Sequence, residues 1–189
     1  MAFFTWTLPS RFTKRACRAD SVAATPGSGR PIASELSKAP LSQLAQRAIG
    51  ACAPLAERAR VRVELASAAA DDVVRMDEPR LLQVVQNLVQ NAIEHTPPGG
   101  WVRVETRPQA RRGQAGVCCT VHDCGPGFDP RHLPHVFEPF FSRRQGGTGL
   151  GLSIVHRIVE QHAGLVEAAN HPDGGGLVSV WLPAETPAA

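Results

Sequence analysis

Three separate segments of this 189-residue chain carry residue types suited to holding a nucleotide. The first is the run Gly-Gly-Thr-Gly-Leu-Gly-Leu at 146–152, which leads directly into an apolar-periodic helix predicted over 153–162. Glycines lack a Cβ, so several backbone N–H groups can converge there, and the start of a helix adds unpaired donors and a partial positive charge. The run therefore predicts a phosphate cradle, although a plain flexible turn can have the same composition.

The second segment is an amphipathic helix over 80–95, in which apolar residues recur at helical period. At about 100° per residue, one stripe of this helix contains Asn87, Asn91, Glu94 and His95. An asparagine offers a carbonyl oxygen to a hard cation and an amide to a phosphate oxygen without adding negative charge, which suits a magnesium ion bound to a triphosphate. The alternative interpretation is an ordinary solvated helix face.

The third segment is Val-His-Asp-Cys-Gly-Pro-Gly at 121–127, which follows an apolar run over 117–121. This order places Asp123 at the tip of a strand, where its carboxylate can accept a hydrogen bond from an exocyclic amine. Gly125 and Gly127 would let a flat base come close to the backbone. The same pattern is equally compatible with a tight turn.

Taken in chain order, these segments and the Phe-Glu-Pro-Phe-Phe element at 137–141 resemble the N, G1, F and G2 boxes of sensor histidine kinases. Those boxes define the ATP-binding domain of two-component signalling kinases, within the GHKL superfamily that also contains gyrase, MutL and the heat-shock chaperone ATPases. The match extends roughly over residues 36–183. The Phe-Glu-Pro-Phe-Phe element points to the kinase branch of the superfamily.

The resemblance implies that ATP and Mg²⁺ are the cofactors. Asn91 would ligate magnesium, Asn87 would help to hold the phosphates, and Asp123 would bind the adenine amine. Gly125 and Gly127 would shape the base pocket. The remaining nucleotide-binding residues that it implies are His95, Phe137, Gly147, Thr148, Gly149, Leu150 and Gly151.

Residues 137–144 would form a mobile lid over the nucleotide. Arg144 stands where many members of the family carry a lid lysine, so together with Arg143 it is the candidate catalytic group that reaches the γ-phosphate. The alternative is a pair of solvated arginines. The chain departs from the family pattern at Glu94, where many members have a basic residue, and at Cys124 and Phe128. Because a carboxylate repels a phosphate, Glu94 is assigned no catalytic role.

All seven histidines of the chain lie at or after residue 95. In the resembled kinases, the phosphoaccepting histidine sits on a separate helical hairpin upstream. We therefore expect the nucleotide-binding and phosphoryl-donating half of the reaction, with the acceptor hairpin supplied in trans or lost, and a response regulator downstream. We also expect a monomer. Two alternatives are a stand-alone anti-sigma-type serine kinase and a non-catalytic domain that senses ATP or binds a partner.

Composition narrows the class of protein. The formal net charge of +3 gives no sign of the basic surface that nucleic-acid binding needs. No apolar stretch approaches the ~20 residues of a membrane-spanning helix. The five cysteines form no Cys-x-x-Cys pair and no zinc-ligand spacing, so we expect reduced thiols. These features predict a cytoplasmic location without membrane contact.

The expected organisation is a disordered tail or remnant linker over 1–35, an ATP-binding domain over 36–183 and a short tail over 184–189. Periodicity predicts a helix over 41–60, which Pro54 should kink or split, and a long helix from about residue 78. Strands are predicted over 61–65, 73–76, 101–106, 117–121, 165–169 and 177–182. The fold class is α/β, a two-layer sandwich with a mixed sheet covered on one face by three helices.

Overall fold

The computed structural model describes residues 17–18, 36–67, 72–141 and 148–184. Its main sheet has six strands in the order β1-β7-β8-β6-β5-β3. A second sheet pairs two short strands, β2 (Ser37–Pro40) and β4 (Val73–Met76). The strands of the main sheet are β1 (Cys17–Arg18), β3 (Arg62–Ser67), β5 (Trp101–Pro108), β6 (Gly116–Asp123), β7 (Leu165–Asn170) and β8 (Gly176–Pro183).

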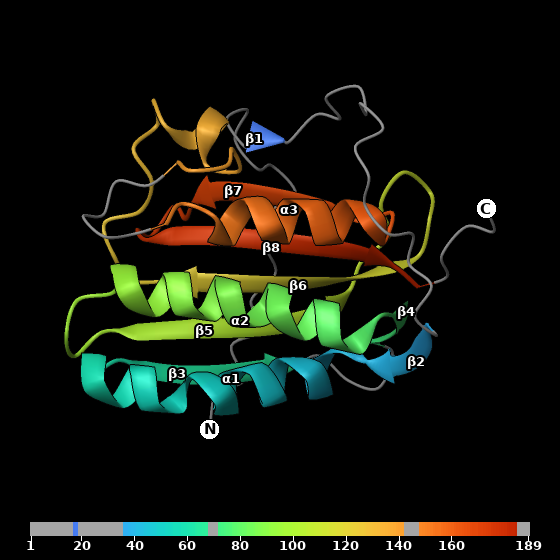
Figure 1. The fold of residues 1–189 in the computed structure, drawn as a ribbon, viewed down its shortest axis with the longest axis horizontal. Helices are drawn as coiled ribbons and strands as arrows, with labels where there is room; N and C mark the ends of the chain where they lie inside the picture. Colours follow the sequence, from blue (N-terminus) through green and yellow to red (C-terminus); the bar gives the residue numbers. More distant parts are fainter. Residues whose placement is uncertain (1–16, 19–35, 68–71, 142–147, 185–189) are drawn as a thin grey trace.

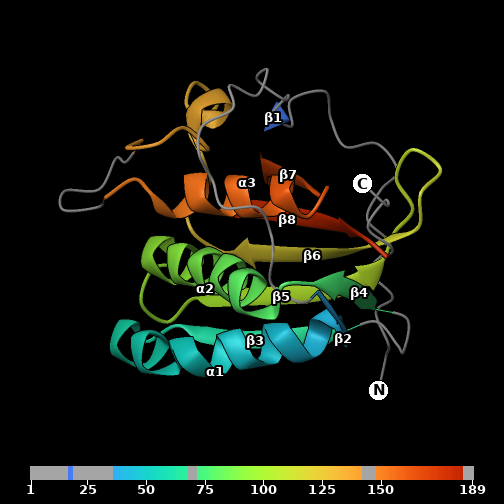
Figure 2. The same cartoon turned by 45° about the vertical axis from the view of Figure 1, so that its right-hand side comes forward.

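Three helices lie side by side on one face of this sheet, as Figures 1 and 2 show from two directions. They are α1 (Leu41–Ala59), α2 (Glu78–His95) and α3 (Gly151–Gln161), and a short 3₁₀ helix, η1 (Leu133–His135), precedes α3. The sheet is mixed, because β3 pairs parallel to β5 and the other pairings are antiparallel. The predicted two-layer α/β sandwich with three helices on one face is confirmed.

The apolar periodicity of α2 explains why this helix packs between α1 and α3 on the sheet. Asp77 is the N-cap, since its side chain accepts a hydrogen bond from the backbone N–H of Arg80, and Pro79 occupies the first turn. The helix ends before Pro97, as the sequence predicts. Its buried face packs on the sheet and on both neighbouring helices; the residues are Leu81, Val84, Val85, Leu88, Val89, Ala92 and Ile93.

The expectation that Pro54 would kink or split α1 is wrong in one respect, because α1 is assigned as one helix from Leu41 to Ala59 with Pro54 inside it. A proline frees the carbonyl four residues earlier, which here belongs to Gly50. Both Gly50 and Pro54 are exposed, so water can satisfy that carbonyl. The helix then ends at Arg60, which adopts a left-handed conformation with φ 56°.

Two residues of the predicted N-terminal tail are described: Cys17 and Arg18 form β1, which pairs antiparallel with β7 opposite Ala168 and Glu167. The remainder of that tail lies outside the described residues, and the division at residue 36 stays a prediction. In the part of the chain that the structure covers, no helix is both long and apolar enough to cross a membrane.

Candidate nucleotide-binding site

The fold brings the asparagine stripe of α2 next to the glycine-led start of α3. The Asn87 side-chain Nδ2 donates a hydrogen bond to the backbone carbonyl of Gly151 at 3.4 Å, across 64 positions of sequence. The two helices pack directly against each other. Two of the three segments that the sequence singles out therefore meet at one place in the structure.

Within the described residues, no side chain caps the start of α3. Leu150 is its N-cap and makes no side-chain cap hydrogen bond, and the first turn contains no acidic residue. In the described part of the chain, the backbone N–H groups of the first turn are therefore not engaged by a side-chain cap and can bind an anion, helped by the helix dipole. A Cβ placed on Gly151 would meet nothing within 4 Å, so the space beside this turn is open. Thr148 is exposed and Gly149 has φ 65°.

The lid is described only in part. Gly147 and the candidate catalytic pair, Arg143 and Arg144, lie outside the described residues. Phe137 is described and buried, and its ring stacks on His156 with centroids 5.9 Å apart. Phe140 is 77% exposed and has a positive φ of 65°. The proposed lid therefore begins with one phenylalanine anchored in the core and another in solvent.

Asp123 ends β6 and is almost fully buried. Its Oδ1 accepts two backbone hydrogen bonds, from Gly125 N–H at 2.8 Å and from Gly176 N–H at 3.2 Å. These two donors orient the carboxylate, and no described residue donates a hydrogen bond to Oδ2, so Oδ2 is available to accept from a ligand. An adenine amine is a donor of the required kind.

The end of α2 packs on the loop that follows Asp123. A Cβ on Gly125 would lie 2.3 Å from the backbone carbonyl oxygen of His95, so only glycine fits there. The His95 ring nitrogen Nδ1 lies 2.8 Å from the backbone oxygen of Asn91, one turn earlier, and its side chain is exposed. His95 is therefore exposed at the end of α2 beside this loop, and its part in nucleotide binding stays a prediction.

Asn91 is the residue that could hold a metal ion. It is half-buried, and within the described part of the chain its side-chain amide makes no hydrogen bond, so its oxygen is available as a ligand. The described residues contain no group of three or more His, Cys, Asp or Glu side chains able to hold a metal by themselves. A single protein oxygen suits Mg²⁺ that is ligated mostly by phosphate oxygens and water.

A pair of stacked histidine rings lies beside Asp123. His122, the residue before Asp123, stacks on His171 with ring centroids 4.2 Å apart, and its Nε2 lies 3.1 Å from the carbonyl oxygen of Gly174. Burial lowers the pKa of His171, and the nearby His122 lowers it further, while Asp173 acts in the opposite direction. His122 is therefore held between the neighbouring His171 ring and the β7–β8 turn.

Sequence reasoning missed two contributors to this site, Gly176 and Asn170, which lie at the two ends of the β7–β8 turn. Gly176 supplies a donor to Asp123, and Asn170 hydrogen-bonds to Phe128. The glycine run at 174–176 is visible in the sequence, but it predicts only a hairpin. Nothing in the sequence indicates that this hairpin contacts a segment about fifty residues earlier.

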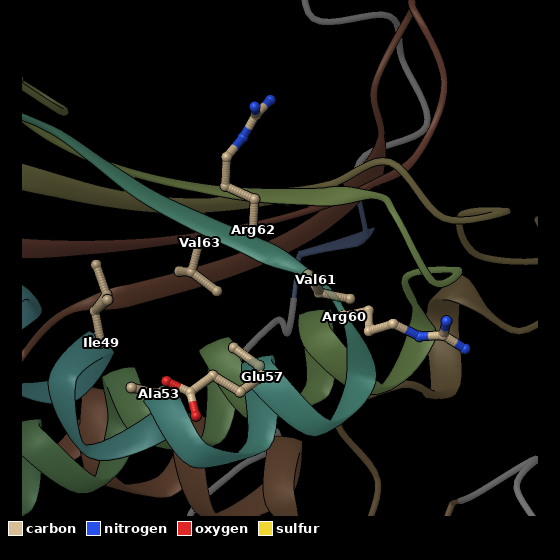
Figure 3. A pocket seen from close by; sticks show the side chains of 8 residues that line it. Ile49, Ala53, Glu57, Arg60, Val61, Arg62 and Val63 are labelled. Carbon is tan, nitrogen blue, oxygen red and sulfur yellow. The ribbon is translucent and has the colours of Figure 1, made fainter.

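A cavity of about 380 Å³ lies elsewhere, between α1 and the edge strand β3 (Figure 3). Ile49 and Ala53 on α1 face Val61 and Val63 on the strand side. In the sheet order, β3 stands at the opposite end from β7 and β8, and none of the predicted site residues lines the cavity. The cavity is therefore separate from the residues predicted to bind the nucleotide.

Comparisons with known proteins agree with this geometry. Residues 76–186 match the family model described as "Histidine kinase-, DNA gyrase B-, and HSP90-like ATPase", and the chain belongs to this family. Among curated proteins, sensor protein SphS of Synechococcus elongatus is 42% identical over 59% of this chain. That match covers 29% of SphS, so the chain corresponds to less than a third of this relative.

Solved structures place the chain more closely within the family. The catalytic domain of histidine kinase ThkA superposes with a TM-score of 0.72 and 27% identity, over 81% of this chain and 98% of that domain. Full-length ShkA in complex with AMPPNP superposes with a TM-score of 0.68 and 30% identity, over 83% of this chain and 33% of ShkA. The described fold is that of a histidine kinase catalytic domain.

Proposed function

We propose that this chain is the ATP-binding catalytic module of a sensor histidine kinase. It would bind Mg²⁺–ATP and donate the γ-phosphoryl group to a histidine on a dimerisation hairpin, and the phosphoryl group would pass to a response regulator. We also propose that this module works in the cytoplasm. The observation that carries the proposal is the state of Asp123, whose Oδ1 is occupied by two backbone donors while Oδ2 remains for the base.

The residues divide the work between base and phosphates. Asp123 Oδ2 accepts from the adenine amine, and the uncapped first turn of α3 binds phosphate oxygens. Asn91 contributes an oxygen to Mg²⁺, and Asn87, already linked to Gly151, aligns α2 with that turn. The metal ion, when bound, neutralises charge on the phosphates.

The chemical step needs little more from this chain. In the transfer, an imidazole nitrogen of the acceptor histidine attacks the γ-phosphorus, the bond to the β,γ-bridging oxygen breaks, ADP leaves, and the imidazole proton passes to a base near the acceptor. Arg144 and Arg143, in the lid segment, are proposed to stabilise negative charge on the γ-phosphate as it transfers.

Titration calorimetry with AMPPNP, with and without Mg²⁺, tests binding. Radiolabelled ATP together with a separately expressed acceptor hairpin tests transfer. We expect magnesium-dependent binding and label on a histidine of the added hairpin. Binding without transfer to any hairpin would favour a domain that senses ATP, and the absence of binding would contradict the proposal.

A stand-alone anti-sigma-type serine kinase is less well supported. The relative and the solved structures described above carry the names of sensor proteins and histidine kinases. The Phe-Glu-Pro-Phe-Phe element at 137–141 also favours the histidine kinase branch. Label on a serine of a partner protein would reverse this preference.

A further inference from the structure

The side chain of Asn170, the last residue of β7, hydrogen-bonds to both backbone groups of Phe128, which lies at the end of the base-pocket loop, residues 123–128. The N–H of Phe128 donates to Asn170 Oδ1 at 2.6 Å, and Asn170 Nδ2 donates to the carbonyl of Phe128 at 2.7 Å. One amide side chain thus satisfies a donor and an acceptor together, as a neighbouring β-strand would.

Gly127, the residue before Phe128, is in direct contact with the same amide. Its φ is 73°, and a Cβ at this position would lie 2.6 Å from Asn170 Oδ1. The glycine therefore serves a close approach as well as a left-handed backbone conformation. The path of the loop after Asp123 is fixed from the Asn170 side.

The β7–β8 turn holds the base-pocket loop, residues 123–128, at both ends. Gly176 donates to Asp123 Oδ1 at the beginning of the loop, and Asn170 holds Phe128 at its end. The Phe128 ring and the free oxygen of Asp123 also lie together, because a Cβ on Gly176 would be 3.1 Å from Phe128 Cε2 and 2.7 Å from Asp123 Oδ2. A shift of Phe128 therefore changes the surroundings of the oxygen assigned to the adenine amine.

We propose that Asn170 is a positioning residue for nucleotide binding. It acts through Phe128, by clamping the backbone that follows the Asp-x-Gly-x-Gly segment, and it does not itself contact the base. This inference rests on the proposed function, because it concerns the same adenine pocket.

Asn170→Asp is the most informative substitution. At pH 7.5 the introduced carboxylate still accepts from Phe128 N–H, but its second oxygen faces the Phe128 carbonyl where Nδ2 donated before. Losing one hydrogen bond and adding a repulsion should weaken AMPPNP binding roughly tenfold. As the pH falls toward 5, the protonated form of the introduced carboxyl group can again donate to that carbonyl, since an aspartic acid ionises near pH 4 and a facing carbonyl raises its pKa.

The expected signature is a ratio of dissociation constants, variant over wild type, that is near ten at pH 7.5 and falls at least twofold by pH 5. Taking the ratio removes the titration of ATP and of the histidines, which are common to both proteins. Asn170→Ala has neither the accepting oxygen nor the donating group, so its loss of AMPPNP affinity should not recover at low pH. Gln46→Glu, at an exposed position of α1, adds the same charge elsewhere and should leave the ratio near one.

Equal affinity of Asn170→Asp and wild type at pH 7.5 would overturn the inference, and so would a loss that stays constant down to pH 5. Amide hydrogen exchange provides a readout without nucleotide: the Phe128 amide should exchange faster in Asn170→Ala than in wild type, while the melting temperature stays within a few degrees. If wild type binds no AMPPNP, the proposed function fails, and unchanged Phe128 exchange would show that the clamp itself is absent.

Discussion

Replacing Asp123 with asparagine should change which base this chain prefers. The two backbone donors on Oδ1, at 2.8 and 3.2 Å, fix the orientation of an asparagine at this position. An amide must keep its oxygen on those two N–H groups, because turning it over would set an NH₂ against two donors. Its NH₂ group then occupies the place of Oδ2 and faces the adenine amine, so two donors meet.

The expected loss of ATP affinity in Asp123→Asn follows from the loss of one hydrogen bond to a charged group. Such a bond contributes about 1.5–3 kcal/mol, and at about 1.4 kcal/mol per tenfold this is a loss of roughly 10- to 140-fold in ATP affinity. A purine with a carbonyl at position 6 should behave differently, because that oxygen can accept from the new NH₂. Inosine triphosphate should therefore lose less affinity than ATP, or gain some.

The assay is calorimetric titration of wild type and Asp123→Asn with ATP and inosine triphosphate in the presence of Mg²⁺. We expect the ratio of the two dissociation constants to move toward inosine triphosphate by at least tenfold. Glu57→Gln, on α1 beside the separate cavity, makes the same charge change and should not move the ratio. An unchanged ratio in Asp123→Asn would refute the assignment of Oδ2 to the adenine amine.

Three further predictions concern other parts of the site. Asn91→Ala should remove the magnesium dependence of AMPPNP binding, and calorimetry that finds the same enhancement by Mg²⁺ as in wild type would contradict its role as a ligand. The pKa of His171 is lowered in the folded chain from its ordinary value of 6.5, so just below pH 6.5 the unfolded chain binds more protons than the folded chain. The free energy of unfolding should therefore fall as the pH drops through 6.5. In urea titrations at pH 7.5 and 5.5, His171→Gln should lose less stability than wild type, and equal losses would disprove this. Burial raises the pKa of the Cys118 thiol to about 11, so iodoacetamide at pH 8 should label the half-buried Cys124 well before Cys118. Peptide mass spectrometry that finds Cys118 labelled first would contradict this prediction.

Much of the fold could be predicted from local patterns in the sequence. The apolar periodicity of residues 80–95 gives α2, and the prolines at 97 and 98 mark its end. Alternation in Trp101–Thr106 gives β5, which is paired with the strand predicted to follow. These predictions succeed because helical and strand periods are properties of short windows. The prediction that Pro54 could split α1 was wrong, because the sequence window does not show that the freed carbonyl of Gly50 lies on the exposed face of the helix, where water can bind it.

The candidate site, like the fold, was predicted where the signal lies within a short segment and not where it depends on contacts between distant segments. Residue types and spacing in the sequence were enough to identify Asn87, Asn91, Asp123 and the glycines as a set suited to a nucleotide, since each motif lies within one short segment. The placement of Arg143 and Arg144 stays a prediction. Tertiary structure alone decided that Gly176 donates to Asp123 Oδ1, and that Asn170 hydrogen-bonds to Phe128 in the loop that follows. Both facts depend on hydrogen bonds between segments 42 and 53 residues apart, and the folding of the β7–β8 turn onto β6 is what brings those partners within reach.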